Sequence, residues 1–164
     1  MNTKVDPLAL AEKYWGDIPV PVFEILSELG LGPDRPAMAE NVSGWIERRG
    51  DGTYKVAVNP THALVRQRFT AAHELGHYIY HRELLGAGVG DSRAYRQEGT
   101  PIPPNAAIQP MHERQANSFA ANLLMPRSSI TALQNLGVNT VAGLAERLQV
   151  SQDAMRIRLG LPRI

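Results

Sequence analysis

The sequence of 164 residues contains no cysteine, and this absence excludes several kinds of site at once. Without thiols, a disulfide framework, a cysteine-ligated zinc finger, an iron–sulfur cluster held by cysteine and a cysteine nucleophile are all ruled out. Any bound metal must be held by histidine, aspartate or glutamate. The chain has only 5 histidines, so the candidate nitrogen ligands can be considered one by one.

Long apolar runs are also missing. The first residues, MNTKVDPLAL, lack the apolar stretch of a signal peptide, and no segment approaches the roughly 18 apolar residues of a membrane span. We therefore expect a soluble, cytoplasmic protein. With 43% hydrophobic residues the chain can bury a core, and its length corresponds to about one domain.

A strong excess of one charge sign is absent as well, because the formal net charge is +1. Residues 1–61 carry 6 basic and 9 acidic side chains, residues 62–126 carry 6 and 5, and residues 127–164 carry 5 and 2. A protein that binds nucleic acid through its main body usually concentrates more positive charge than this. Only the C-terminal segment, in which basic side chains outnumber acidic ones, keeps DNA as a candidate partner.

Apolar periodicity and turn residues predict a mixture of helices and strands. Two short helices are expected at 7–14 and 20–29, where apolar residues recur at intervals of three and four. An Asp-Gly pair predicts a hairpin between strands at 42–48 and 53–58. The Gly- and Pro-rich stretch 84–110 fits no regular element and is expected to be a surface loop or flap. The remaining helices are expected at 63–82, 111–125, 128–136, 140–149 and 152–159.

The run His73-Glu74-Leu75-Gly76-His77 matches the pattern HExxH within a predicted helix, which Asn59-Pro60-Thr61 can cap. On a helix the two histidines lie about 40° apart, so both imidazoles can bind one ion. Glu74 lies about 60° further round, outside the ligand shell but close enough to take a proton from a water there. The alternative is an amphipathic helix whose polar face holds these residues by coincidence.

Two histidines and a water leave a tetrahedral catalytic zinc one protein ligand short. The extended pattern HExxHxxGxxH is not met, because Tyr80 and Glu83 occupy its glycine and third histidine positions. A carboxylate from the helix at 111–125 is the alternative, and Glu113 is the best placed. Three other residues are rival ligands by type but are better interpreted as packing, loop or helix-end residues: His81, His112 and Asp91.

Two further residues would support a metal held between these helices. Asn117 lies one turn after Glu113 on the same face, so its side-chain oxygen can accept the second ring N–H of His73 or His77. Gly76 has no side chain and would let the second helix approach closely. Glu113 itself has an alternative interpretation as an exposed carboxylate favoured at a helix N-terminus.

The segments RQRFTAAHELGHYIYH (66–81) and ERQANSFAANLLMP (113–126), in this order, resemble the ImmA/IrrE family of zinc metallopeptidases. The resemblance implies an α+β, zincin-like fold with N-terminal helices, a small antiparallel sheet, an HExxH helix and a second ligand helix. It also implies a protein substrate, a helix-turn-helix transcriptional repressor whose cleavage relieves repression of stress or mobile-element genes. The site implied by the resemblance is a zinc ion with the ligands His73, His77 and Glu113, and the catalytic base Glu74.

Residues 141–159 resemble a helix-turn-helix, with Val150-Ser151 at the turn. Arg156 and Arg158 in the second helix suit phosphate contacts, but Gln149 stands where such turns often have glycine. We expect this segment to pack on the peptidase or dock a repressor more readily than to bind specific DNA.

The chain is therefore divided into a metallopeptidase core, residues 1–126, and a small helical appendage, residues 127–164, packed on the core. Hydrolysis of a peptide bond also needs a donor for the oxyanion. The candidates are Tyr78, Tyr80, His81, Tyr95, Arg96 and His112. An extended substrate is expected to add to the sheet edge formed by Tyr54 to Val58.

A non-enzymatic regulator is the second function that the sequence allows. In that hypothesis the metal is structural and the C-terminal helices bind DNA or a partner protein, as in a toxin–antitoxin pair. Glu74 favours the enzyme, because a structural metal needs no base beside an open position. A zinc hydrolase of a small amide would use the same chemistry, and a His-His-Glu set also accepts manganese or iron.

Overall fold

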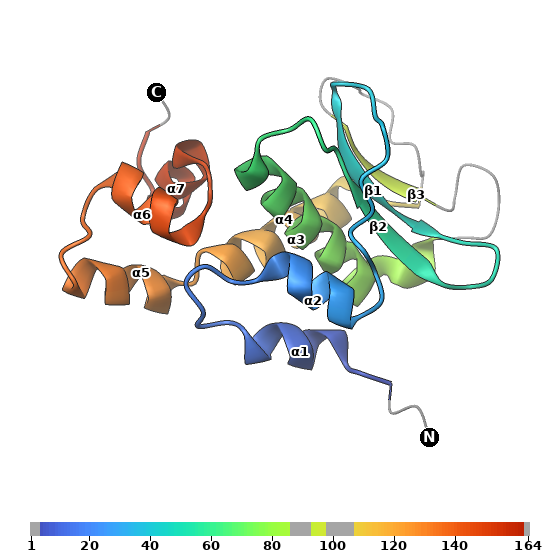
Figure 1. The fold of residues 1–164 in the computed structure, drawn as a ribbon, viewed down its shortest axis with the longest axis horizontal. Coiled ribbons are helices and arrows are strands. Elements are labelled where there is room, and N and C mark those ends of the chain that lie inside the picture. The colour runs from blue at the N-terminus through green and yellow to red at the C-terminus, as the bar shows by residue number, and fades with distance from the viewer. Residues whose placement is uncertain (1–3, 86–92, 98–106, 163–164) are drawn as a thin grey trace.

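The computed structural model of the chain describes residues 4–85, 93–97 and 107–162. A small sheet lies on one side of a long central helix, and further helices lie on the other sides (Figure 1). The elements are α1 (Pro7–Lys13), α2 (Val22–Glu28), β1 (Val42–Arg48), β2 (Tyr54–Val58), α3 (Leu64–His81), a 3-10 turn (Arg82–Leu84), β3 (Arg93–Gln97), α4 (Pro110–Leu124), α5 (Arg127–Asn135), α6 (Val141–Leu148) and α7 (Gln152–Leu159). This architecture is compatible with the zincin-like α+β fold that the sequence predicts.

The predicted hairpin is present and its turn has a local cause. The Asp51 carboxylate accepts hydrogen bonds from the Thr53 backbone N–H at 2.9 Å and from the Thr53 hydroxyl at 2.6 Å. Gly52 adopts a φ of 85°, which glycine reaches without the cost that a Cβ would add. β1 and β2 then pair antiparallel from Gly44 with Val58 to Arg48 with Tyr54.

The expectation of no regular element in 84–110 is wrong for one segment. Residues Arg93–Gln97 form β3, which pairs antiparallel with β1 and gives the strand order β2-β1-β3. The strand is short and its sequence is mostly polar, so no local pattern predicts it, and the strand with which it pairs is far away in the sequence. The rest of the predicted loop, at 86–92 and 98–106, lies outside the described residues.

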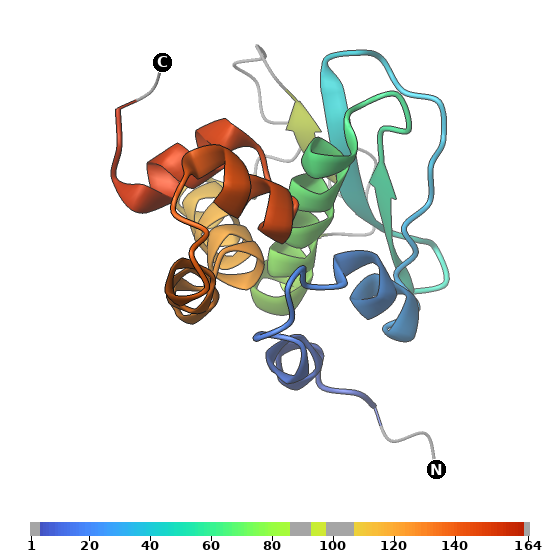
Figure 2. The same ribbon diagram turned by 60° about the vertical axis from the view of Figure 1, so that its left-hand side comes forward.

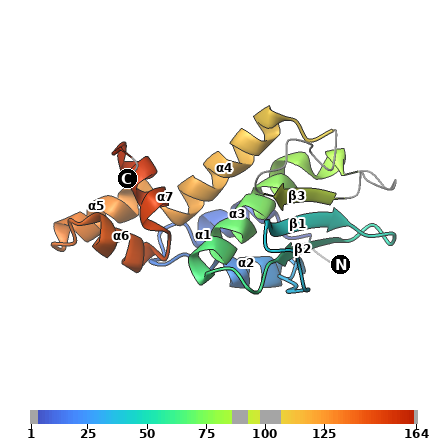
Figure 3. The ribbon, with the colours of Figure 1, turned by 90° about the horizontal axis from the view of Figure 1, so that it is seen from above.

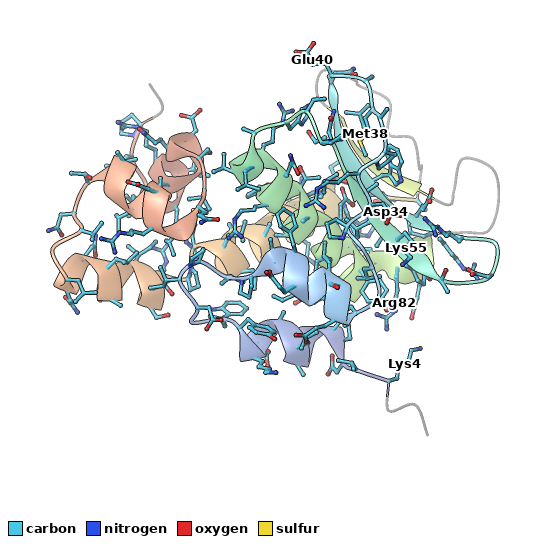
Figure 4. All side chains as sticks on the ribbon, viewed as in Figure 1. Lys4, Asp34, Met38, Glu40, Lys55 and Arg82 are labelled. Atoms are coloured by element: carbon cyan, nitrogen blue, oxygen red, sulfur yellow. The ribbon has the colours of Figure 1, made fainter. Side chains whose placement is uncertain are left out.

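The expectation that β2 offers an open edge to substrate is also wrong. The Val56 N–H donates to Leu31 O at 2.8 Å, and the Asp34 N–H donates to Val56 O at 2.9 Å. The Val58 N–H donates to Asp34 O at 3.0 Å, so the segment after α2 already covers this side of β2. Asp34 and Lys55 lie near each other along this margin of the sheet (Figure 4). The other edge of the sheet is β3.

The long helix α3 lies between the sheet and α4 and is buried along most of its length (Figure 2). Gly44 of β1 brings the sheet close to it, because a Cβ there would clash with Ala57 O and with the Thr70 methyl group of α3. The predicted cap by Asn59-Pro60-Thr61 is not formed, because the N-cap residue of α3 is Ala63 and no side chain caps the helix. The Asn59 side chain instead accepts from the Thr61 N–H and donates to Val42 O.

The C-terminal helices α5, α6 and α7 share the apolar core with the rest of the chain, and two arginines add hydrogen bonds between them and the core. Buried Arg68 of α3 donates to Gln149 O at 3.1 Å and to Val20 O at 2.9 Å. Arg158 of α7 donates to Met125 O, at the end of α4, at 2.9 Å. Gln149 adopts a left-handed φ of 54°, so it takes the conformation for which glycine is usually chosen at this turn.

Among the described helices, none combines the length and apolar character that crossing a membrane requires.

We expect Arg68→Met to lower the free energy of unfolding by about 2 kcal/mol or more, because it leaves buried carbonyl groups without their charged donor. Urea denaturation of the full chain measures this loss. Arg147→Met on the exposed face of α6 is the matched control and should change stability little. Equal losses in the two variants would contradict the structural role given to Arg68.

Candidate metal centre

Three side chains from two helices converge on one point. His73 and His77 come from α3 and are each 1% exposed, and Glu113 comes from the first turn of α4. His73 Nε2 lies 2.9 Å from Glu113 Oε2, and His77 Nε2 lies 3.2 Å from Glu113 Oε1. One ligand atom from each residue lies within 4.8 Å of the others, a spacing that one metal ion can bridge. The sequence therefore identified residues that the fold brings together.

The ring orientation of His73 is set by α4. Its Nδ1 lies 2.7 Å from Asn117 Oδ1, the hydrogen bond expected from the sequence. Because that oxygen can only accept, the ring proton of His73 belongs on Nδ1. The lone pair of Nε2 is thereby directed to the point where Glu113 lies, as metal-ligating histidines are usually oriented.

His77 is oriented by a second chain of hydrogen bonds. His81 Nε2 lies 2.8 Å from Gln115 Oε1, so His81 donates there and its Nδ1 is left as an acceptor. His77 Nδ1 lies 2.9 Å from His81 Nδ1 and donates to it. The proton of His77 is therefore on Nδ1, and its Nε2 faces Glu113. His81 thus packs behind a candidate ligand, consistent with the expectation that it is not itself a ligand.

The ionisation state of the Glu113 carboxylate also suits a metal ligand. Burial raises the pKa of Glu113, but the close approach of the His73 and His77 rings outweighs burial and holds the pKa far below its usual range. Glu113 is consequently ionised at neutral pH, the state in which a carboxylate binds a cation.

Gly76 determines how closely the two helices approach. A Cβ at this position would lie 3.2 Å from Ala116 Cα and 3.2 Å from Phe119 Cδ1, which is tighter than ordinary contact. The absence of a side chain therefore lets α4 lie directly on α3. This is the role that the sequence predicts for Gly76.

Glu74 follows His73 in α3 and is fully buried beside the candidate ligands. Its carboxylate is therefore next to the candidate metal position, which is where a metallopeptidase would need a general base. The donor set of two imidazoles and one carboxylate fits a divalent metal, and it is a set that catalytic zinc sites use with a remaining position for water or substrate.

The remaining candidate ligands and oxyanion donors from the sequence lie away from the three converging side chains or outside the described residues. His112 does not ligate: its Nδ1 accepts the Gln109 N–H at 2.9 Å and so caps α4. Asp91 lies outside the described residues, and so do the side chains of the oxyanion candidates Tyr95 and Arg96. Tyr78 packs edge-on against the Tyr54 ring. The sequence reasoning missed Gln115 as the partner of His81, because only the contact between helices brings the two together.

The fold and the donor set define a candidate metallopeptidase. Residues 34–160 match the model of a peptidase family described as the IrrE N-terminal-like domain. The match covers more than half of the chain, and the chain belongs to this family. No curated protein matches the chain. The family implies protease activity, and the cluster of His73, His77 and Glu113 is able to bind a metal.

We expect Asn117→Ala to weaken zinc binding about 10- to 100-fold, because His73 loses the acceptor that holds its ring. Competition with a chromogenic chelator measures the affinity directly, without any substrate. Ser118→Ala, one residue further on the exposed side of α4, is the matched control and should bind zinc as the wild type does. An unchanged affinity in Asn117→Ala would show that the ring needs no such support.

Proposed function

We propose that this chain is a zinc-dependent endopeptidase in which His73, His77 and Glu113 hold the metal. The observation that carries the proposal is the convergence of these three donors beside buried Glu74, in a member of a peptidase family. Zinc is the preferred ion because two histidines and one glutamate with an open position form a known catalytic zinc set. When bound, zinc supplies Lewis acidity and lowers the pKa of water at the site to about 7.

The residues of the chain supply the proton transfers and the orientation. Glu74 takes a proton from the attacking water and passes it to the nitrogen of the leaving amine, which completes hydrolysis of the peptide bond. Asn117 and the pair His81 and Gln115 keep both imidazole rings in the ligating tautomer.

We propose a protein as the substrate, of the helix-turn-helix repressor class that the family resemblance implies. Because the outer side of β2 is covered, an extended substrate would add to β3, the other edge of the sheet, which contacts α3. The resulting cleavage would relieve repression. Regulation of transcription in this way would need no DNA contact by the chain itself.

We keep the division into a peptidase core, 1–126, and a helical appendage, 127–164, as part of this proposal. The turn between α6 and α7 supports the likeness of the appendage to a helix-turn-helix. A non-enzymatic regulator that binds DNA is less well supported, because Arg158 of α7 is engaged with Met125 O rather than presented outward.

We expect Glu74→Gln to keep zinc and the fold but to lose cleavage by at least about 100-fold, because the base is removed while the ligands remain. The measurement incubates the zinc-loaded protein with the helix-turn-helix protein encoded by the neighbouring gene and follows cleavage by mass spectrometry. Removal of zinc by a chelator should abolish the same cut.

Glu83→Gln is the matched control, because it makes the same chemical change at an exposed carboxylate in the 3-10 turn after α3. It should cleave at the wild-type rate. Full activity in Glu74→Gln would remove this residue from the mechanism. If the wild type cuts a general peptide library but leaves the repressor intact, the peptidase stands and the proposed substrate class is wrong.

A further inference from the structure

A groove of about 780 Å³ lies between α3, α4 and α7. Its size falls within the about 300–1,000 Å³ of typical ligand-binding clefts. Figure 3 shows α7 at the end of the molecule where α3 begins and α4 ends. The groove is thus enclosed partly by the core and partly by the C-terminal helices.

The groove lies next to the candidate metal centre. Asn117 lines it, and the same side chain holds the His73 ring. Phe69, one helical turn before His73, lines it from α3. A polypeptide positioned for cleavage at the metal would therefore reach the groove with the residues next to the scissile bond.

Apolar side chains form much of the groove surface. Val65 and Phe69 of α3 and Ala121 of α4 face Ile157 of α7 across it. Ile157 is 53% exposed, so part of the apolar surface of α7 in the groove is open to solvent. A ligand with an apolar side chain would bury this surface.

The charge of the groove is positive. Among its described lining residues are Arg66, Arg127 and Arg158, and Asp153 is the single acidic one. Arg127 and Arg158 are close enough to repel each other: burial lowers the pKa of Arg158, and the charge of Arg127 lowers it further. An acidic ligand would relieve this repulsion.

We propose that this groove binds the substrate polypeptide beside the scissile bond and selects an apolar side chain flanked by acidic residues. The inference rests on the proposed peptidase function. It assigns to α7 a surface for recognition of the substrate rather than of DNA, because the α7 residues Asp153, Ile157 and Arg158 face the same groove as Asn117.

The test measures binding, so that it does not depend on cleavage. Three fluorescein-labelled peptides of equal length are titrated with the full chain carrying Glu74→Gln, with and without zinc. One peptide alternates leucine with glutamate, one alternates leucine with lysine, and one alternates serine with glutamate. Fluorescence anisotropy should show that the leucine–glutamate peptide binds at least about tenfold more tightly than either of the others.

Two pairs of variants locate the binding site. Arg127→Glu and Ile157→Glu should each weaken binding of the leucine–glutamate peptide about tenfold or more. Arg127 is the first residue of α5, where a carboxylate is compatible with the helix, so this variant should fold. The controls Arg147→Glu and Leu136→Glu make the same changes at exposed positions outside the groove and should bind normally.

Equal binding of the acidic and basic peptides, or equal loss in Arg127→Glu and Arg147→Glu, would overturn the proposal. So would displacement of the bound peptide by a duplex DNA, which would make the arginines phosphate contacts. Absence of binding by all three peptides would refute the groove as a peptide site. If the groove binds as expected but the zinc-loaded wild type cleaves nothing, only the proposed peptidase function fails.

Discussion

The direct packing of α3 on α4 at Gly76 is the constraint on which the candidate metal centre depends. Both candidate histidine ligands are on α3. The carboxylate of Glu113, the Asn117 side chain that holds His73, and Gln115, which acts on His77 through His81 of α3, are on α4. A Cβ at Gly76 would lie 3.2 Å from Ala116 and from Phe119, so these neighbours on α4 would have to shift by a few tenths of an ångström. A shift of a fraction of an ångström there moves Glu113 relative to both imidazoles at once, because helices move as rigid units.

Burying two imidazoles beside a carboxylate is costly unless every polar atom is satisfied. At the two Nδ1 atoms the chain meets this requirement with two sets of hydrogen bonds, one that links His77 through His81 to Gln115 and one that links His73 to Asn117. Both arrangements end with an Nε2 directed at Glu113. The metal site is therefore prepared by the polar contacts between the helices and does not have to be assembled by the ion.

The sequence predicts those parts of the molecule whose signals are local. Helical periodicity gives α3 and α4, and the spacing of His73, Glu74 and His77 follows from one helix. β3 is missed because its pairing with β1 is not a local signal, and the cover on β2 is missed because the backbone hydrogen bonds of Leu31 and Asp34 leave no pattern in the sequence. The pairing of His81 with Gln115 is equally non-local, since the two lie on different helices.

The C-terminal helices are part of the same structural unit as the metal centre. Arg68 joins α3 to the turn between α6 and α7, and Arg158 joins α7 to the end of α4, so two charged hydrogen bonds hold opposite sides of one groove. A recognition helix that reads DNA must present its outer face to the major groove. Here Ile157 of α7 lines the same groove as Asn117, and Asn117 contacts a candidate ligand. A resemblance to a DNA-binding motif in sequence is thus compatible with a role in holding a polypeptide next to the metal.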